Sequence, residues 1–204
     1  MVIGVDFDNT IVCYDDLFHR IAVERGLVPP GLEPRKNIVR DFLRQAGREQ
    51  EWTGLQGYVY GARMAEARPF PDVLEFFARS RQAGLPVYVI SHKTRAPVQG
   101  PAYDLRQTAR EWLAAQGLFD SARTGLSPDR VFFGDTRPDK IQLIKTLGCT
   151  LFIDDLEETF CEETFPDGVE KILFGSRLDP LVLPGVRRVK DWQEINDYVF
   201  NVRH

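Results

Sequence analysis

The sequence predicts an α/β fold, in which a Rossmann-like parallel sheet carries helices on both faces. Two observations lead to this prediction. Short apolar segments rich in β-branched and aromatic residues alternate along the chain with segments of helical periodicity. The apolar segments are also nearly continuous, which is typical of strands that are buried on both faces of a sheet. Strands that alternate with helices in this way form parallel sheets.

The expected strands are short, and several are followed by polar residues. They are residues 2–7, 87–90, 131–133, 150–153 and 171–174. Between them, apolar side chains recur at helical spacing in three groups: Val73, Leu74, Phe76 and Phe77; Leu105, Ala109, Trp112 and Leu113; and Ile141, Ile144 and Leu147. The third helix has a start signal, because Thr136 and Asp139 have the spacing of a capping box, and Gly148 is its stop signal. A last helix is expected over about residues 191–200.

One long segment departs from this alternation. Residues 14–68 contain helical patterns only, and the corner Pro29-Pro30-Gly31 divides them. We therefore expect a small helical insertion over residues 14–68, with residues 1–13 and 69–204 forming the core. A second irregular segment, residues 93–103, contains prolines and a glycine and is expected to be an exposed loop over the same edge of the sheet. The apolar residues of the insertion are Tyr14, Leu17, Phe18 and Ile21, followed by Ile38, Val39, Phe42, Leu43 and Ala46.

The composition, with 43% apolar and 27% charged residues, excludes a disordered tail, a collagen-like fibre and a disulfide scaffold. The net charge is −4, from 26 basic and 30 acidic residues without a basic stripe, so we expect no nucleic acid as a general partner. No apolar run is long enough to cross a membrane, and the first residues predict no secretory signal. We expect a cytoplasmic protein with reduced cysteines, which are Cys13, Cys149 and Cys161.

Polar residues at the ends of the strands are the candidates for chemistry, because ligands bind outside the carboxyl ends of parallel strands. The first expected strand ends in Asp6-Phe7-Asp8-Asn9-Thr10. Side chains alternate along a strand, so Asp6 and Asp8 are expected to point the same way. Two adjacent carboxylates repel each other unless a cation or a shared proton compensates. A simple turn is the alternative, since Asp, Asn and Thr are common after strands.

Three further polar groups stand at comparable places. Ser91 begins Ser91-His92-Lys93-Thr94 after the second expected strand, and Asp154-Asp155 follows the fourth. Taken alone, the Asp154-Asp155 pair fits a solvated turn or a helix N-cap equally well. Lys140 lies in the first turn of a predicted helix, where the helix dipole disfavours a cation. Such local conflicts tend to mark functional sites.

Together these groups fit one kind of chemistry. Carboxylates from two strands bind a hard divalent cation, most simply Mg²⁺, through oxygen. A hydroxyl and an ammonium bind phosphate oxygens, and one carboxylate is then free to attack phosphorus and form an aspartyl phosphate.

The ordered set resembles the four loops of the haloacid dehalogenase (HAD) superfamily of phosphotransferases. The loops match as Asp6-x-Asp8-x-Thr10, Ser91, Lys140 and Asp154-Asp155, and the segment Arg68-Pro69-Phe70-Pro71-Asp72-Val73 also agrees. The resemblance covers roughly residues 1–13 and 69–200. The expected helical insertion falls where this family places its type one cap.

The resemblance implies a role for each matched residue. Asp6 is implied to be the nucleophile and a metal ligand. Asp8 is implied to bind the metal through its backbone carbonyl, to protonate the leaving alcohol and then to activate the attacking water. The implied phosphate-binding residues are Ser91, Lys140 and Asn9, and the implied metal ligands are Asp6, Asp8, Asp154 and Asp155.

A second segment, Gly134-Asp135-Thr136-Arg137-Pro138-Asp139, also looks like the last loop of this family, which often reads GDxxxD. If Asp135 belonged to that loop, the lysine loop would have to lie upstream, and no lysine occurs between Lys93 and Lys140. Placing Asp135 at the end of the third strand keeps the loops in order. We therefore favour Asp154-Asp155 as the last loop.

The resemblance further implies phosphomonoester hydrolysis, because a carboxylate at the position of Asp8 suits phosphatases rather than the dehalogenases or phosphorylated pumps of the family. We expect a Mg²⁺-dependent phosphatase acting on a small phosphorylated metabolite, a phosphosugar or a nucleotide. The alternatives are a phosphoryl-transferring mutase, a phosphatase of a protein- or carrier-bound phosphate, and a catalytically silent binding module of the same fold. The insertion and the 93–103 loop should cover the leaving group. The residues of these two segments that we expect to contact substrate are Arg63, Tyr58, Tyr60, Lys93 and Arg95.

Overall fold

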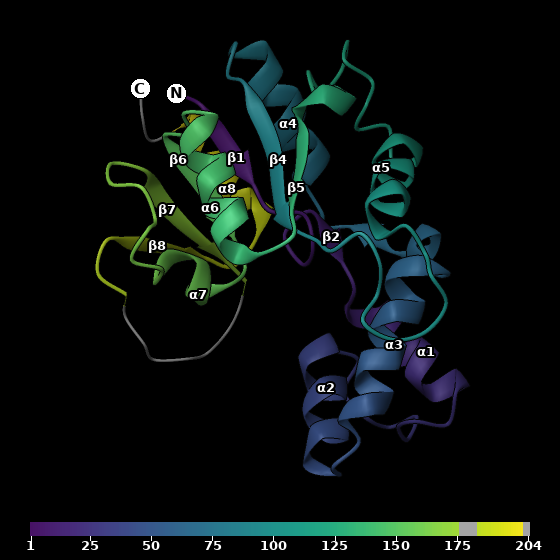
Figure 1. Cartoon of the computed structure of the whole chain (residues 1–204). Coiled ribbons are helices and arrows are strands. Elements are labelled where there is room, and N and C mark those ends of the chain that lie inside the picture. Colours follow the sequence, from purple (N-terminus) through teal and green to yellow (C-terminus); the bar gives the residue numbers. More distant parts are fainter. Residues whose placement is uncertain (176–182, 202–204) are drawn as a thin grey trace.

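A six-stranded parallel sheet forms the centre of the molecule (Figure 1). The computed structural model describes residues 1–175 and 183–201. The strand order is β5-β4-β1-β6-β7-β8, which confirms the predicted α/β class. The strands are β1 (Ile3–Val5), β4 (Val87–His92), β5 (Val131–Gly134), β6 (Leu151–Asp154), β7 (Glu170–Phe174) and β8 (Val186–Val189).

Helices cover both faces of this sheet, as predicted. On one face, residues such as Val89 and Ile153 pack with α4, α5 and α8, and on the other, Ile90 and Phe152 pack with α6 and α7. Neighbouring residues of a strand face opposite sides, which explains why the strands are apolar throughout. The helices are α4 (Val73–Gln82), α5 (Leu105–Ala115), α6 (Arg137–Thr146), α7 (Glu157–Phe160) and α8 (Trp192–Phe200), with a short 3-10 helix, η2 (Pro128–Arg130), before β5.

The expected start of α6 is confirmed in detail. The hydroxyl of Thr136 accepts a hydrogen bond from the backbone N–H of Asp139, and the Asp139 carboxylate accepts one from the backbone N–H of Thr136. This reciprocal pair satisfies two of the donors that a helix N-terminus leaves unpaired. Gly148 follows the helix at a positive φ of 64°.

Strand β8 is the one strand of the six-stranded sheet that the sequence pattern did not predict. Its residues Val186-Arg187-Arg188-Val189 place two arginines between two valines, so no apolar run is visible. It lies at the edge of the sheet, where it has a neighbour on one side, and therefore needs less apolar surface than a central strand.

The segment expected to be a helical insertion contains helices from Asp15 to Glu66, and two short strands flank them. The strands β2 (Val12–Cys13) and β3 (Arg68–Pro69) pair antiparallel, and the helices α1 (Asp15–Glu24), α2 (Lys36–Gln45) and α3 (Glu49–Gly61) and the 3-10 helix η1 (Met64–Glu66) lie between them. Figure 1 shows α1, α2 and α3 gathered beside the sheet rather than on either face of it. The description of residues 14–68 as a cap domain stays a prediction.

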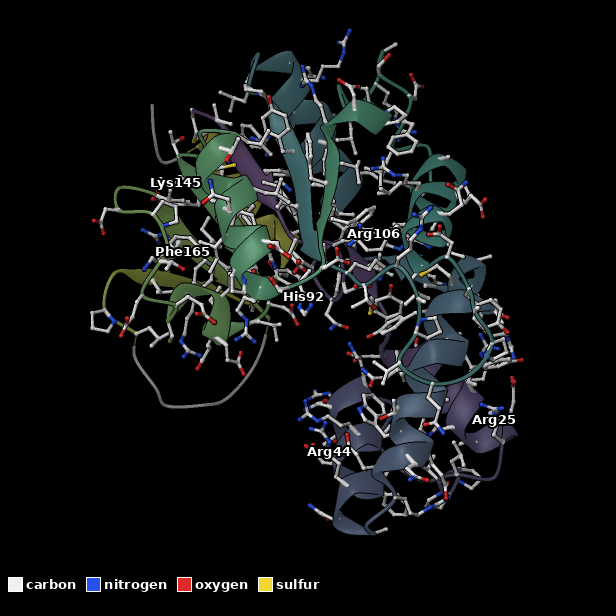
Figure 2. All side chains as sticks on the ribbon, in the orientation of Figure 1. Arg25, Arg44, His92, Arg106, Lys145 and Phe165 are labelled. Atoms are coloured by element: carbon white, nitrogen blue, oxygen red, sulfur yellow. The ribbon has the colours of Figure 1, made fainter. Side chains whose placement is uncertain are left out.

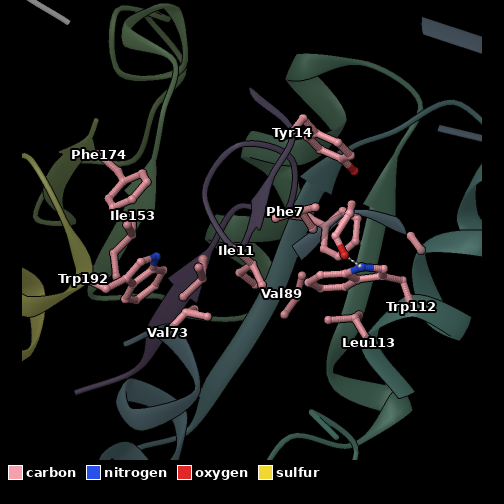
Figure 3. Packing of buried hydrophobic residues seen from close by; sticks show 14 of the residues in the cluster. Phe7, Ile11, Tyr14, Val73, Val89, Trp112, Leu113, Ile153, Phe174 and Trp192 are labelled. Atoms are coloured by element: carbon pink, nitrogen blue, oxygen red, sulfur yellow. Dashed lines mark hydrogen bonds between the residues drawn. The ribbon is translucent and has the colours of Figure 1, made fainter. Parts of the chain in front are cut away.

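Two buried tryptophans tie the ends of this insertion to the core (Figure 3). The indole N–H of Trp192 in α8 donates to the Thr10 carbonyl at 2.8 Å, just before the insertion. The indole N–H of Trp112 in α5 donates to the Ala67 carbonyl at 2.9 Å, at the end of the insertion. A buried indole N–H requires such a partner, so the two bonds fix where the chain leaves the core and returns.

Helix α3 packs against the 93–103 loop through two glycines. A Cβ added at Gly57 would come within 2.4 Å of the Gln99 carbonyl oxygen, and one added at Gly61 within 2.1 Å of the Tyr103 ring. The glycines therefore permit a close approach that any side chain would prevent.

No helix in the described part of the chain has the length and apolar character needed to cross a membrane. All three cysteines are free thiols.

The contact between α3 and the loop predicts a specific loss of stability. We expect Gly61→Ala to lower the free energy of unfolding by about 1–3 kcal/mol, because the new methyl group overlaps the Tyr103 ring. The matched control is Gly54→Ala in the same helix, where the nearest atom lies at 3.8 Å. That change should be neutral or stabilising by about 0.5–1 kcal/mol. Urea unfolding measures both, and an equal response of the two variants would contradict the packing described.

Candidate active site

Pairing of β1 with β6 brings two aspartates together at one edge of the sheet. Val5 lies opposite Ile153, and the next residue along each strand is an aspartate, Asp6 or Asp154. The Lys140 ammonium donates hydrogen bonds of 2.6 Å to both Asp6 Oδ1 and Asp154 Oδ2. The side chains of Asp6, Lys140 and Asp154 are only 6%, 3% and 0% exposed. Lys140 is therefore buried as a bridge between the carboxylates of two strands.

Gly134 allows Lys140 to reach this position. It ends β5, and a Cβ there would lie 2.8 Å from the Lys140 backbone nitrogen and 2.9 Å from Asp139 Cβ. The absence of a side chain lets the first turn of α6 pack directly against the strand end. The positive charge of Lys140 is unfavourable at the N-terminus of its own helix, but the carboxylates of Asp6 and Asp154 stabilise it.

Asp155 adds a third carboxylate to the group. Asp6, Asp154 and Asp155 each offer an oxygen, and these oxygens all lie within 4.8 Å of one another. One ammonium thus faces three carboxylates, and all of the donors are oxygen atoms. The charge and the donor chemistry both fit a hard divalent cation such as Mg²⁺.

The titration behaviour of the group reflects this excess of negative charge. Burial raises the pKa of Asp6 to about 6; Lys140 opposes this shift and Asp154 adds to it. Burial likewise raises the pKa of Asp155 to about 8, and the charges of Asp6 and Asp154 add to it. Burial disfavours the charged form of Lys140, but Asp154 and Asp6 outweigh it and raise its pKa above the ordinary value. Lys140 is therefore a permanent cation.

Asp8 occupies a different environment from Asp6, although the two are near neighbours in sequence. The Lys93 ammonium donates to both of its carboxylate oxygens, at 3.0 and 2.7 Å, and the Tyr14 hydroxyl donates to Oδ1 at 2.6 Å. Burial disfavours the ionised form, but Lys93 and Tyr14 together lower the pKa of Asp8 below its ordinary value. Asp8 is therefore an ionised carboxylate at neutral pH. The proposed metal contact through its backbone carbonyl stays a prediction.

The two other expected phosphate-binding residues lie at the same edge of the sheet. Ser91 is buried in β4, the strand next to β1. Asn9 follows Asp8 in a turn with a positive φ of 57°, a conformation that Asn tolerates better than most residues. Their contacts with phosphate stay predictions.

A cleft of about 660 Å³ opens next to the carboxylates. It runs between α2 of the insertion and the ends of β6 and β7, and Asp155 and Asn9 belong to its wall. The remaining lining residues are Asp15, Arg35, Lys36, Asn37, Arg40, Trp52, Phe70, Leu156, Phe174, Gly175 and Lys190.

The candidate substrate contacts have other partners in the structure. Lys93 is paired with Asp8, and the Tyr60 ring lies 4.8 Å from the Lys93 ammonium. Arg63 is bound by Glu66 and by Glu24 within the insertion. Tyr58 stacks against Arg25 on the insertion, and Arg95 pairs with Asp104 on the exposed part of the loop. None of the five is among the described residues that line the cleft, and their contact with substrate stays a prediction.

The sequence analysis missed Tyr14 as a partner of Asp8 and Lys36 and Arg40 as residues of the cleft. For Lys36 a signal existed. Helix α2 begins with a lysine and has no acidic residue in its first turn, the same conflict with the helix dipole that singled out Lys140.

Asp135 lies apart from the carboxylate group. Its side chain is 70% exposed and pairs with Arg106 at 2.5 Å, and its backbone carbonyl hydrogen-bonds with the His92 ring at 3.0 Å. Figure 2 shows His92 and Arg106 near the lower end of the sheet. Asp154 and Asp155 therefore belong to the carboxylate group and Asp135 does not, and the assignment of the acidic loop stays a prediction.

Comparisons with known proteins show which fold the chain has. No protein-family model matches the sequence, and no curated protein sequence does. Among solved structures, a HAD family hydrolase from Deinococcus radiodurans R1, with bound phosphate and sodium, is similar at 16% identity and a TM-score of 0.59, covering 97% of this chain and 94% of that one.

Two other structures have comparable similarity. A HAD-superfamily hydrolase from Ehrlichia chaffeensis is 13% identical with a TM-score of 0.55, over 97% of this chain and 95% of that one. A dehalogenase is 12% identical with a TM-score of 0.56, over 97% of this chain and 96% of that one. The chain therefore has the fold of the HAD-superfamily hydrolases.

Proposed function

We propose that this chain is a Mg²⁺-dependent phosphomonoester hydrolase, which acts on a small phosphorylated metabolite through an aspartyl phosphate on Asp6. The observation that carries the proposal is the buried group in which Lys140 bridges Asp6 and Asp154, with an Asp155 oxygen within 4.8 Å of both. The fold shared with hydrolases supports the reaction class. The phosphate bound in the Deinococcus radiodurans structure is consistent with a phosphorylated ligand.

The three carboxylates of Asp6, Asp154 and Asp155 would hold the metal ion. When bound, Mg²⁺ would neutralise negative charge on the phosphoryl oxygens and on the carboxylates around them. Lys140 keeps one oxygen of Asp6 in a fixed hydrogen bond, which orients the carboxylate and leaves its second oxygen for attack.

In the first step, the free oxygen of Asp6 attacks phosphorus, and the bond between phosphorus and the leaving alcohol breaks. Asp8 gives a proton to the alcohol oxygen. Because Lys93 and Tyr14 keep Asp8 ionised in the free protein, Asp8 must first take that proton from a substrate that binds with its phosphate singly protonated. In the second step, water attacks the phosphorus of the aspartyl phosphate and Asp8 accepts its proton. The products are the alcohol, inorganic phosphate and a regenerated Asp6 carboxylate.

Dehalogenation is the competing reaction, since a dehalogenase shares the fold. Asp8 favours the phosphatase. A carboxylate at this position is expected of the phosphatases of the family and not of the dehalogenases. In this chain, Lys93 and Tyr14 hold it in its ionised form, as the second step requires.

The nucleophile is tested by phosphate release from a panel of phosphosugars, nucleotides and a generic aryl phosphate. We expect turnover with Mg²⁺, none with a chelator, and a fall on the order of 10³-fold or more for Asp6→Asn. The matched control is Asp135→Asn, which removes an exposed carboxylate outside the group and should retain activity. Activity that survives in Asp6→Asn, or disappears in Asp135→Asn, would refute the assignment of the site.

The raised pKa of Asp155 predicts how pH affects the stability of the metal-free protein. Its pKa is about 8 in the folded chain against 3.8 for an ordinary aspartate, so the folded state retains a proton that the unfolded state has lost. The contribution of Asp155 to the free energy of unfolding is fully present below about pH 4 and is lost as the pH rises through 8. In a chelator, wild type should therefore lose stability relative to Asp155→Asn between pH 5 and pH 8.

Thermal unfolding of both proteins at several pH values measures the effect. Added Mg²⁺ should stabilise wild type more at pH 8, where the carboxylate is ionised, than at pH 5. The Asp155→Asn variant should show a smaller Mg²⁺ effect. Parallel stability curves for the two proteins would show that Asp155 does not titrate in this range.

A further inference from the structure

Lys36 is a cation in the wall of the cleft, held by the insertion. It begins α2, and its backbone N–H donates to Asp15 Oδ1 at 3.0 Å. Its ammonium lies 5.5 Å from the centre of the Tyr14 ring and 5.4 Å from those of Phe18 and Tyr60. Aromatic faces attract a cation without neutralising it, and the Tyr60 hydroxyl, which accepts a hydrogen bond from the ammonium, is also uncharged. These contacts position the Lys36 ammonium without supplying a negative charge.

Within the described part of the chain, no carboxylate lies within 4 Å of the Lys36 ammonium. The other cations of the cleft wall each have one: Arg35 has Glu33 at 2.9 Å, Arg40 has Asp41 at 2.7 Å, and Lys190 has Glu194 at 3.5 Å. Burial disfavours the charge on Lys36, but Tyr60, Asp155 and Asp8 outweigh it and raise its pKa above the ordinary value. A neutral amine that could form a covalent adduct with a carbonyl group is therefore not expected here.

The cleft that contains Lys36 is continuous with the carboxylate group, because Asp155 belongs to both. A phosphoryl group at Asp6 would therefore have its leaving group in this cleft. Two of the three aromatic residues in the wall, Trp52 and Phe174, are only 2% and 4% exposed, so they offer little face for stacking a nucleobase, and the third, Phe70, is partly buried. The charged side chains of the wall are four cations, Arg35, Lys36, Arg40 and Lys190, and two carboxylates, Asp15 and Asp155, so positive charge is in excess.

From this arrangement we infer that the substrate carries a second anionic group on its leaving group, a carboxylate or a second phosphate, which pairs with Lys36, with Arg40 as a neighbouring cation. The inference rests on the proposed function. It narrows the substrate class from phosphomonoesters in general to phosphorylated acids and bisphosphates. Phosphosugars whose sugar carries no charged group are then poor substrates.

A three-carbon series of phosphate esters tests the inference, because its members differ only at the far end. The series is propyl phosphate, 3-phosphooxypropanoate, the carboxamide of that acid, and the bisphosphate of 1,3-propanediol. For wild type, kcat/KM for the acid or the bisphosphate should exceed that for the amide at least about tenfold. The acid and the bisphosphate show which of the two anions the cleft prefers.

The variant Lys36→Gln should reduce this ratio to about 2 or less, because the amide side chain carries no charge to pair with the anion. A ratio measured within one protein does not depend on the fraction that is folded. The matched control is Arg25→Gln, which also removes one charge and one cation–aromatic contact from the insertion, outside the cleft wall. It should leave the ratio unchanged, which separates a local contact from a change in net charge.

A binding measurement makes the test independent of turnover. Calorimetry with Asp6→Asn and with Asp6→Asn/Lys36→Gln compares the dissociation constants of the acid and of the amide. Selective binding of the acid that requires Lys36 supports the inference, even if no member of the series is hydrolysed, a result that would count against the proposed function alone. Equal binding of acid and amide, or selectivity that survives Lys36→Gln, would overturn the inference.

Discussion

The Lys140 bridge between Asp6 and Asp154 is the interaction on which the candidate site depends. All three side chains are buried, and a buried charge that loses its partner costs about 3–5 kcal/mol. The bridge requires β1 and β6 to be neighbours, and it requires α6 to begin against the end of β5. The strand order meets the first requirement, and Gly134 with the capping box at the start of α6 meets the second.

The core and the carboxylate group could be predicted from the sequence because the signals that specify them are local. A run such as Val87–Ile90 or a capping box such as that of Thr136 is complete within a few residues. The grouping of Asp6 with Asp154 then follows from a general property of parallel sheets, whose carboxyl ends share one edge. The role of the glycines at positions 57 and 61 of α3 could not be predicted in this way, because it depends on the loop that they contact. That contact exists only in the folded chain.

The same reason explains why the partners of two lysines were missed. Lys93 is predicted to contact substrate because it follows a strand at the sheet edge, but nothing near it in the sequence reveals that its ammonium binds Asp8, 85 positions away. Lys36 lies among rings from α1 and α3, and no spacing within α2 reveals them. A charge that conflicts with its own helix dipole was a usable signal, and it applied to Lys36 as well as to Lys140. Such a signal shows that tertiary contacts must stabilise the cation, but it does not show which residues make those contacts.

Asp6 and Asp8 illustrate how the fold gives different properties to two carboxylates on one short segment. Burial raises the pKa of Asp6, and the charge of Asp154 adds to this shift while Lys140 opposes it. Asp8 is also buried, but Lys93 and the Tyr14 hydroxyl outweigh the effect of burial and lower its pKa. Pairs of acids whose environments push their pKa values apart are typical of sites where one residue attacks and the other moves protons. Tyr14 immediately precedes α1, so the chain entering the insertion contributes directly to the ionisation of Asp8. Because α2 also brings Lys36 to the cleft, the insertion contributes both to the ionisation of Asp8 and to the charge of the cleft wall.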